Sequence, residues 1–347
     1  MVQAPLFISL RPLNPRPLEP FSEFMKEVTT PLMGDPMNKI ERVDRVLRGD
    51  EVDYPPISLW YHFGVQHAGG EQFARISLEY FHHYDLDFLK VMNDYYYPTP
   101  AGLDTVRSQE DLRKFTAFDV DRCEWREQFK ALRIISRELK GRAYFIDTVF
   151  DPWQSIRRSV AGENMEHLAQ NEPQALHAAL SAVAENLITY SMKAIEIGAA
   201  GIFMSVPAAK EIVSREIFLT FVKPYVMKVF AAVSGLGRMN TAHIHGDDLY
   251  MDDCLDFPVD VFSWWDRGPH GPSMEDIKQR FPGCVMGGID QTLLTRRSPA
   301  LLKAHVTEGV ALGGGRRFFM ANGCSIDTWV SPEAVRAVVA AARISGR

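Results

Sequence analysis

Cysteine is scarce in this 347-residue sequence, and its start shows no secretion signal. The four cysteines lie far apart, at Cys123, Cys254, Cys284 and Cys324. The first residues lack the charged-then-apolar pattern of a signal peptide, so we expect no structural disulfides and a cytoplasmic location.

Long apolar runs are missing too. Even residues 175–200 carry Glu185, Lys193 and Glu196, which argues against a membrane span of about 20 residues.

Clustered basic residues are also absent. The formal net charge is -6, and no run of lysine or arginine offers the positive face that neutralises phosphates. Nucleic acid is therefore not expected as a partner. What is present is an ordinary globular composition, with 46% hydrophobic and 24% charged residues. This composition predicts a folded chain with a large core.

A glycine-rich phosphate turn of the dinucleotide-binding type is missing after the first predicted strand, where only Gly64 and the pair at 69–70 occur. Eight short apolar runs alternate with longer amphipathic segments, and most are too continuously apolar for a sheet with one wet face. These predicted strands span 57–61, 88–92, 143–148, 201–205, 239–244, 260–264, 284–288 and 317–321. The count favours an α/β protein with a single-domain (β/α)8 TIM barrel over residues 36–347.

Residues 1–35 are rich in proline and show no regular period, which predicts an irregular N-terminal arm without chemistry. Whether this arm wraps a second subunit, as in a homodimer, stays open. Asp35 and Pro36 are predicted as the cap and first residue of a helix ending at Gly49. Further helices are expected at 122–139, 173–197 and 298–311. Three glycines at 313–315 then precede a strand, which favours a helix C-cap over a phosphate site.

The active site of a (β/α)8 barrel lies at the carboxyl ends of the strands. Polar side chains follow the predicted strands here more consistently than solubility requires. Asp94 and Asp147 are the candidate catalytic residues. The candidate substrate-binding residues are His62, Asn93, Tyr95, Asp151, Ser205, Asp266 and Asp290.

Two histidines and a cysteine form the sharpest local feature. His243 and His245 are spaced i and i+2 on the fifth predicted strand, so both imidazoles can point to the same side. Cys324 follows the eighth strand, which lies across the barrel mouth from the fifth. Two imidazoles and one thiolate with an open fourth position suit catalytic zinc. Alternatively, the histidines are a hydrogen-bonded polar pair and the cysteine is an ordinary turn residue.

The acids have a structural alternative as well. Asp94, Asp147 and Asp290 could each cap the helix that follows its strand. Asp147 and Asp151 could instead act as acid and base, because partial desolvation raises a carboxyl pKa toward neutrality. The tyrosines at 95–97 could line a flat substrate or pack the adjacent proline-containing loop.

Two segments resemble the uroporphyrinogen decarboxylase superfamily. Residues 38–56 (NKIERVDRVLRGDEVDYPP) are similar to its first helix and first strand, and residues 284–327, with GGID, TLL and ANGCSID, are similar to its last two strands. The resemblance implies the barrel fold over the chain from Asn38 onward. True uroporphyrinogen decarboxylases use no metal and have an aspartate after the second strand. The resemblance places Asp94 at the position of that aspartate. Their arginine pair after the first strand is replaced by residues 60–67 (WYHFGVQH), so uroporphyrinogen is a poor substrate candidate.

The other branch of the superfamily comprises methyltransferases that move a methyl group between a corrinoid protein and a thiol, using zinc. Their His-x-Cys motif and distant cysteine fall on His243, His245 and Cys324, with His245 replacing a cysteine. The resemblance therefore implies a zinc-dependent methyltransferase with a small-molecule substrate and a corrinoid carried by a partner protein. Two alternatives remain: a metal-free decarboxylase of a smaller acid, with Asp94 holding the substrate, and a barrel that binds a ligand or corrinoid protein without chemistry.

Overall fold

The computed structural model describes residues 37–345, so the predicted arm at 1–35 lies outside the described residues and its boundary stays a prediction. The first helix, α1 (Lys39–Arg48), begins later than the sequence suggested. Its N-cap is Asn38, whose side chain accepts a hydrogen bond from the Glu41 backbone N–H at 2.9 Å, so the prediction of Asp35 as the cap is wrong. The helix ends as predicted at Gly49, which has the left-handed conformation (φ 82°).

Eight parallel strands form the centre of the molecule. They are β1 (Ile57–Ser58), β2 (Phe88–Val91), β3 (Tyr144–Phe150), β4 (Ile202–Val206), β5 (Thr241–Ile244), β6 (Val261–Trp264), β7 (Cys284–Ile289) and β8 (Phe318–Asn322). Each strand from β2 to β8 pairs with the next along the chain, and β8 pairs with β1. The predicted (β/α)8 barrel is thereby confirmed.

The barrel is nearly closed between β1 and β2, where Asp87 joins the two strands. Its backbone N–H donates to the Ile57 carbonyl at 2.9 Å, and its carboxylate accepts from the Ile57 N–H at 3.0 Å. Arg42 of α1 donates to the same carboxylate at 2.7 Å. One fully buried acid therefore replaces part of a β-ladder and ties α1 to the barrel.

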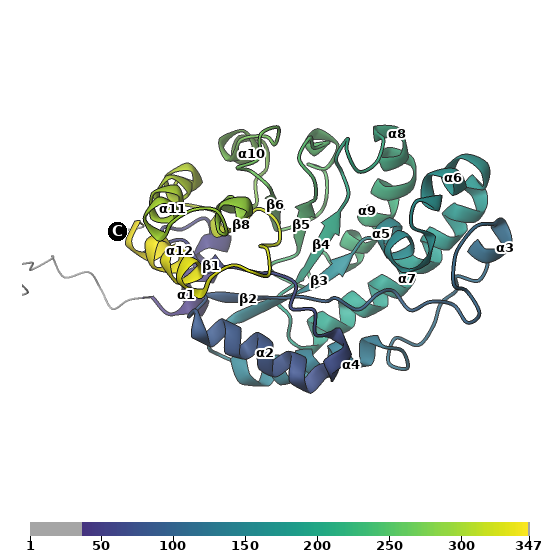
Figure 1. Cartoon of the computed structure of the whole chain (residues 1–347), viewed down its shortest axis with the longest axis horizontal. Coiled ribbons are helices and arrows are strands. Elements are labelled where there is room, and N and C mark those ends of the chain that lie inside the picture. The colour runs from purple at the N-terminus through teal and green to yellow at the C-terminus, as the bar shows by residue number, and fades with distance from the viewer. Residues whose placement is uncertain (1–36, 346–347) are drawn as a thin grey trace, which may run out of the picture. The chain divides into compact units, whose positions relative to one another are not determined.

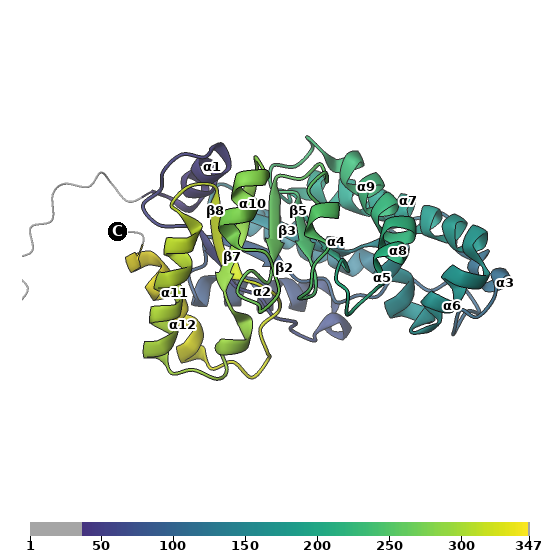
Figure 2. The same ribbon diagram turned by 90° about the horizontal axis from the view of Figure 1, so that it is seen from above.

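Helices surround the strands in both views (Figures 1 and 2). The longer ones are α2 (Gly69–His83), α4 (Trp125–Leu139), α6 (Asn164–Asn171), α7 (Pro173–Ile197), α9 (Lys223–Val233), α10 (Met274–Arg280), α11 (Pro299–Gly313) and α12 (Pro332–Ser345). Short helices are α3 (Gln109–Leu112), α5 (Pro152–Ile156) and α8 (Arg215–Ile217). Across residues 37–345, no helix is both long and apolar enough to cross a membrane.

The predicted helices are present with small shifts at their ends. The helix predicted at 173–197 matches α7, whereas α4 begins three residues after the predicted 122. Gly314 caps α11 in the left-handed conformation (φ 66°), as expected for a C-cap. Because these glycines precede β8, they lie at the amino end of the strand and away from the barrel mouth.

Aromatic side chains fill the barrel interior between strands. Trp60, directly after β1, meets Phe203 of β4 edge to face at 5.2 Å between ring centroids, and Phe88 of β2 meets Phe319 of β8 at 5.5 Å. Such contacts pack the interior as a solid core and not as a pore. Chemistry is therefore confined to the layer above this core, at the carboxyl ends of the strands.

Candidate active site

A cavity of about 220 Å³ opens at the carboxyl ends of the strands. It is lined by Trp60, His62, Lys90, Met92, Thr148, Phe150, Gln154, Arg158, Phe203, Ser205, His243, His245, Cys324 and Ser325. These residues lie on, or in the segments that follow, the six strands β1 to β5 and β8, as a barrel active site requires. We call this space the mouth cavity. No aspartate or glutamate among the described residues lines it.

The structure brings together the three predicted metal ligands. One ligand atom from each of His243, His245 and Cys324 lies within 4.8 Å of the others. Cys324 Sγ is 3.6 Å from His245 Nδ1. Two ligands of a tetrahedral zinc ion are roughly 3.5 Å apart, given metal–ligand distances of about 2.0–2.3 Å. The spacing of this pair therefore fits a shared metal ion.

Surrounding hydrogen bonds hold these side chains in place. His243 is buried, and its Nδ1 lies 3.2 Å from Ser263 Oγ, which leaves Nε2 free for a ligand role. Cys324 is held through its backbone: its N–H donates to Gln291 Oε1 at 3.1 Å and its carbonyl accepts from Asn322 Nδ2 at 2.6 Å. Neighbouring residues thus hold the His243 ring and the Cys324 backbone, and His245 contacts the Cys324 thiol.

The protonation of the trio also suits a metal. Burial lowers the pKa of His243 well below its usual value, and burial likewise lowers the pKa of His245. Both imidazoles are therefore neutral at pH 7, which is the form that binds metal. Burial raises the pKa of the Cys324 thiol, so a bound cation is what would make it a thiolate. The donor set fits Zn²⁺ better than it fits a hard oxygen-binding cation.

Lys90 is a site residue that the sequence reasoning missed. It lies on β2 inside the barrel and is only 4% exposed, with Nζ 4.6 Å from the Phe203 ring centroid and 5.3 Å from that of Trp60. Burial lowers its pKa to about 7. A single lysine inside the otherwise apolar run FLKVM was the signal that could have revealed it.

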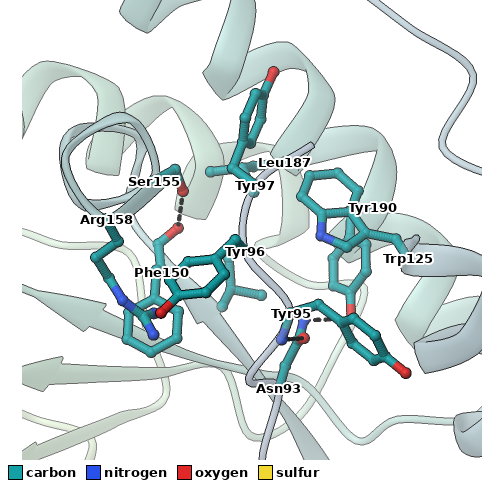
Figure 3. A pocket seen from close by; sticks show the side chains of 11 residues that line it. Asn93, Tyr95, Tyr96, Tyr97, Trp125, Phe150, Ser155, Arg158, Leu187 and Tyr190 are labelled. Atoms are coloured by element: carbon teal, nitrogen blue, oxygen red, sulfur yellow. Dashed lines mark hydrogen bonds between the residues drawn. The ribbon is translucent and has the colours of Figure 1, made fainter. Parts of the chain in front are cut away.

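Arg158 is the second residue that sequence reasoning missed. It belongs to a π-helical turn, Arg157–Ala161, that follows α5, and its guanidinium carbon lies 3.5 Å from the Phe150 ring centroid. Figure 3 shows its side chain beside Phe150 and near Tyr96. Nothing in the local sequence distinguishes it from the exposed Arg157 next to it. The π-turn that directs it toward the cavity depends on tertiary packing.

His62 and Asp94 form a hydrogen-bonded pair at the edge of the mouth cavity, between His62 Nδ1 and the Asp94 carboxylate. Burial alone would raise the pKa of Asp94, but the hydrogen bond and charge of His62 lower it overall. His62 lines the cavity and Asp94 does not. Asp94 therefore caps no helix among the described residues and contacts the cavity-lining His62.

Ser205 also lines the mouth cavity, as expected, and its hydroxyl and carbonyl accept hydrogen bonds from Gln154 Nε2 at 3.3 and 2.9 Å. Asn93 and Tyr95 lie instead around a neighbouring small pocket of about 20 Å³, which also touches Phe150 and Arg158 (Figure 3). Tyr97 is buried and accepts a hydrogen bond from Asn186, so it packs the loop.

Asp147 and Asp151 are fully buried and lie outside the lining of the mouth cavity. Burial raises the pKa of each to about 7. Asp147 accepts from Gln128 at 2.9 Å and contacts the Tyr190 hydroxyl at 2.6 Å. Asp151 caps α5 by accepting from the Trp153 N–H at 3.0 Å. The structure thus places helix capping at Asp151, and not at Asp147.

Asp266 and Asp290 also lie outside this cavity lining. Asp266 accepts from the Gly288 N–H at 2.9 Å, and burial raises its pKa to about 6. Asp290 caps a short 3-10 turn through the Thr292 N–H at 2.9 Å, in agreement with the capping alternative. Both carboxyls have backbone partners at the strand ends.

Solved structures with a similar fold include a methyltransferase from Methanosarcina mazei, with a TM-score of 0.69 and 18% identity over 88% of this chain and 98% of that chain. A putative vitamin-B12-independent methionine synthase from Listeria monocytogenes has a TM-score of 0.51 and 11% identity over 79% of this chain and 85% of that chain. At these identities the likeness shows the shared barrel fold.

Sequence comparisons identify the family. A curated uroporphyrinogen decarboxylase of Trichodesmium erythraeum (strain IMS101) is 23% identical over 326 residues, covering 81% of this chain and 89% of the relative. The family model described as uroporphyrinogen decarboxylase (URO-D) matches residues 93–344. That match covers well over half of the chain, which therefore belongs to the uroporphyrinogen decarboxylase family.

Proposed function

We propose that this protein is a zinc-dependent methyltransferase that moves a methyl group between a corrinoid protein and a small molecule. The observation that carries the proposal is the convergence of His243, His245 and Cys324 within 4.8 Å at the barrel mouth. The methyltransferase from Methanosarcina mazei, similar over 88% of this chain, supports the choice of this branch. Zinc, when bound, would act as a Lewis acid on the heteroatom of the methyl donor or acceptor.

The second histidine sets the electrostatics of the proposed site. Two neutral imidazoles and one thiolate leave a zinc ion with a formal charge of +1, whereas a His-Cys-Cys site is neutral. A more positive site acidifies a bound thiol or water more strongly and lowers its nucleophilicity. This chain is therefore suited to a heteroatom that leaves as an anion, such as the oxygen of a methyl ether. In such a reaction the methyl C–O bond would break with its electron pair on oxygen, which the ion held by His243, His245 and Cys324 would stabilise, and a reduced corrinoid would supply the electron pair for the new bond to the methyl group.

The chain's own residues perform the remaining work. Asp94 fixes the ring of His62 through its Nδ1, so the other ring nitrogen can deliver or accept a proton at the edge of the cavity. We assign Asp94 as a positioning residue and place Asp147 in the supporting hydrogen-bond network. The corrinoid protein would approach over the open mouth, where His62 is exposed.

Elemental analysis of protein purified without chelator tests the metal. Wild type should contain about one zinc per chain, and His245→Ala and Cys324→Ala should each lose most of it, because removing one of three ligands weakens a zinc site strongly. Cys123→Ala is the matched control, since this half-buried thiol lies outside the mouth cavity. A wild-type protein without zinc, both as isolated and after zinc addition, would refute the proposal.

A metal-free decarboxylase is the second candidate, favoured by the cations of the mouth cavity and by the similar Trichodesmium enzyme. In this reaction Lys90 and Arg158 would hold a substrate carboxylate, and an imidazole would protonate the carbanion left when CO₂ departs. A metal-free decarboxylase would keep its full activity in the presence of a chelator. Carbon dioxide release from small acids in the presence and absence of chelator therefore separates the two candidates.

A further inference from the structure

The charges that face the mouth cavity are unbalanced. The cavity is lined by two basic residues, the titratable Lys90 and the permanently charged Arg158, and by three histidines. Within residues 37–345, no carboxylate lines the same cavity. Positive groups removed from water are costly unless an opposite charge compensates them. Asp94 interacts electrostatically with both cations, but its hydrogen bond goes to His62. A direct anionic partner for Lys90 and Arg158 is therefore expected to come from a ligand.

Lys90 has no acidic partner within ion-pair distance among the described residues. The polar atom that contacts its ammonium group is the Met92 sulfur at 2.6 Å, and a thioether is a weak acceptor. The rings of Trp60 and Phe203 lie against it. Cation–π contacts of this kind hold the protonated lysine in position, and a bound anion would favour that protonated form.

Arg158 is likewise without an ion pair in the described part of the chain, whereas Arg42 and Arg215 each engage an aspartate through two guanidinium nitrogens. It stacks on Phe150 at 3.5 Å, and the nearest tyrosine ring, Tyr96, lies 5.6 Å away. Stacking covers one face of a guanidinium and leaves its N–H groups, which lie in the plane, free to bind. The planar fork matches a carboxylate.

We propose that Lys90 and Arg158 form an anion-binding subsite that selects a small aromatic carboxylate as the substrate of the mouth cavity. The inference rests on the proposed function, in which the His243, His245 and Cys324 end of the cavity receives the reacting heteroatom. Trp60, Phe150 and Phe203 line the same cavity and supply apolar surface beside the two cations for an aromatic ring. A cavity of about 220 Å³ has room for a single-ring molecule.

Calorimetric titration with 4-methoxybenzoate tests the subsite, with 4-methoxybenzamide as an uncharged ligand of nearly equal shape. Wild type should bind the acid at least about tenfold more tightly than the amide, because a charge-assisted pair contributes more than about 1.4 kcal/mol. Arg158→Gln and Lys90→Met should each remove most of this preference. Arg157→Gln, at the exposed neighbouring arginine, should keep it.

Three results would overturn the subsite: no binding of the acid to wild type, equal binding of acid and amide, or unchanged preference in both variants. Inorganic phosphate is the third probe. Phosphate binding that exceeds that of the aromatic acid would contradict the aromatic class. Zinc content, measured in the same samples, should be unchanged by Arg158→Gln. Acid-selective binding by a wild-type protein that takes up no zinc, even after zinc addition, would refute the methyltransferase proposal and leave the subsite standing.

Discussion

At the residue scale, burial determines what each polar side chain of the barrel mouth can do. Ser205 and the ring nitrogens of His243 and His245 remain at the cavity, whereas Asp147 lies beneath it with both carboxyl oxygens engaged. The sequence placed all of these residues at strand ends correctly. It could not rank them, because exposure at a barrel mouth depends on which neighbour covers which side chain.

Asp147 yields a pH prediction. Its pKa in the folded protein is about 7, above the value of 3.8 expected when unfolded. Between these values the folded state keeps a proton that the unfolded state releases, so this group makes stability fall as the pH rises. Asp147→Asn, which cannot titrate, should reduce this fall by up to about 1 kcal/mol per pH unit in urea unfolding between pH 5 and 7. Parallel wild-type and variant profiles would contradict the raised pKa.

At the element scale, the strands could be predicted and the turns after them could not. Each of the eight apolar runs overlaps an observed strand, because continuous burial leaves a clear composition signal. The i, i+2 spacing on β5 and the position of β8 across the mouth were sufficient to bring Cys324 toward His245. The π-turn at Arg157–Ala161 has no such sequence signal. The sequence therefore could not predict that this turn is partly buried or that Arg158 lines the cavity.

The closure between β1 and β2 gives a prediction at this scale. Asp87→Ala leaves Arg42 without one of its buried partners and removes the acceptor of the Ile57 N–H. Loss of one partner of a buried pair should lower the free energy of unfolding by about 3–5 kcal/mol. The control is Asp50→Ala, which breaks the exposed ion pair with Arg48 of α1. It should lower the free energy of unfolding by less than about 1 kcal/mol. Similar losses in chemical denaturation would show that Asp87 does not hold the closure.

At the scale of the whole molecule, the barrel fold and the family followed from the sequence, whereas the balance of charge in the cavity did not. The number of strands can be predicted from the apolar pattern of each short segment alone. The two cations face one space only once β2 and the turn after α5 are folded together, so the apolar run around Lys90 could mark it as unusual but could not show that Arg158 lines the same cavity. Net charge of the chain, at -6, gives no hint of a positive active site.

Metal removal tests the molecule as a unit. The proposed ligands come from β5 and from the segment after β8, so a bound zinc ion would connect opposite sides of the barrel. A ligand specific to the folded state adds about 4 kcal/mol when its free concentration is a thousand times its Kd. Urea unfolding with buffered zinc should therefore show higher stability than unfolding in chelator, for wild type and Cys123→Ala alike. Cys324→Ala should show little difference between the two conditions. If zinc stabilised Cys324→Ala as much as wild type, zinc would bind elsewhere in the protein. The assignment of a zinc site to the barrel mouth would then be wrong.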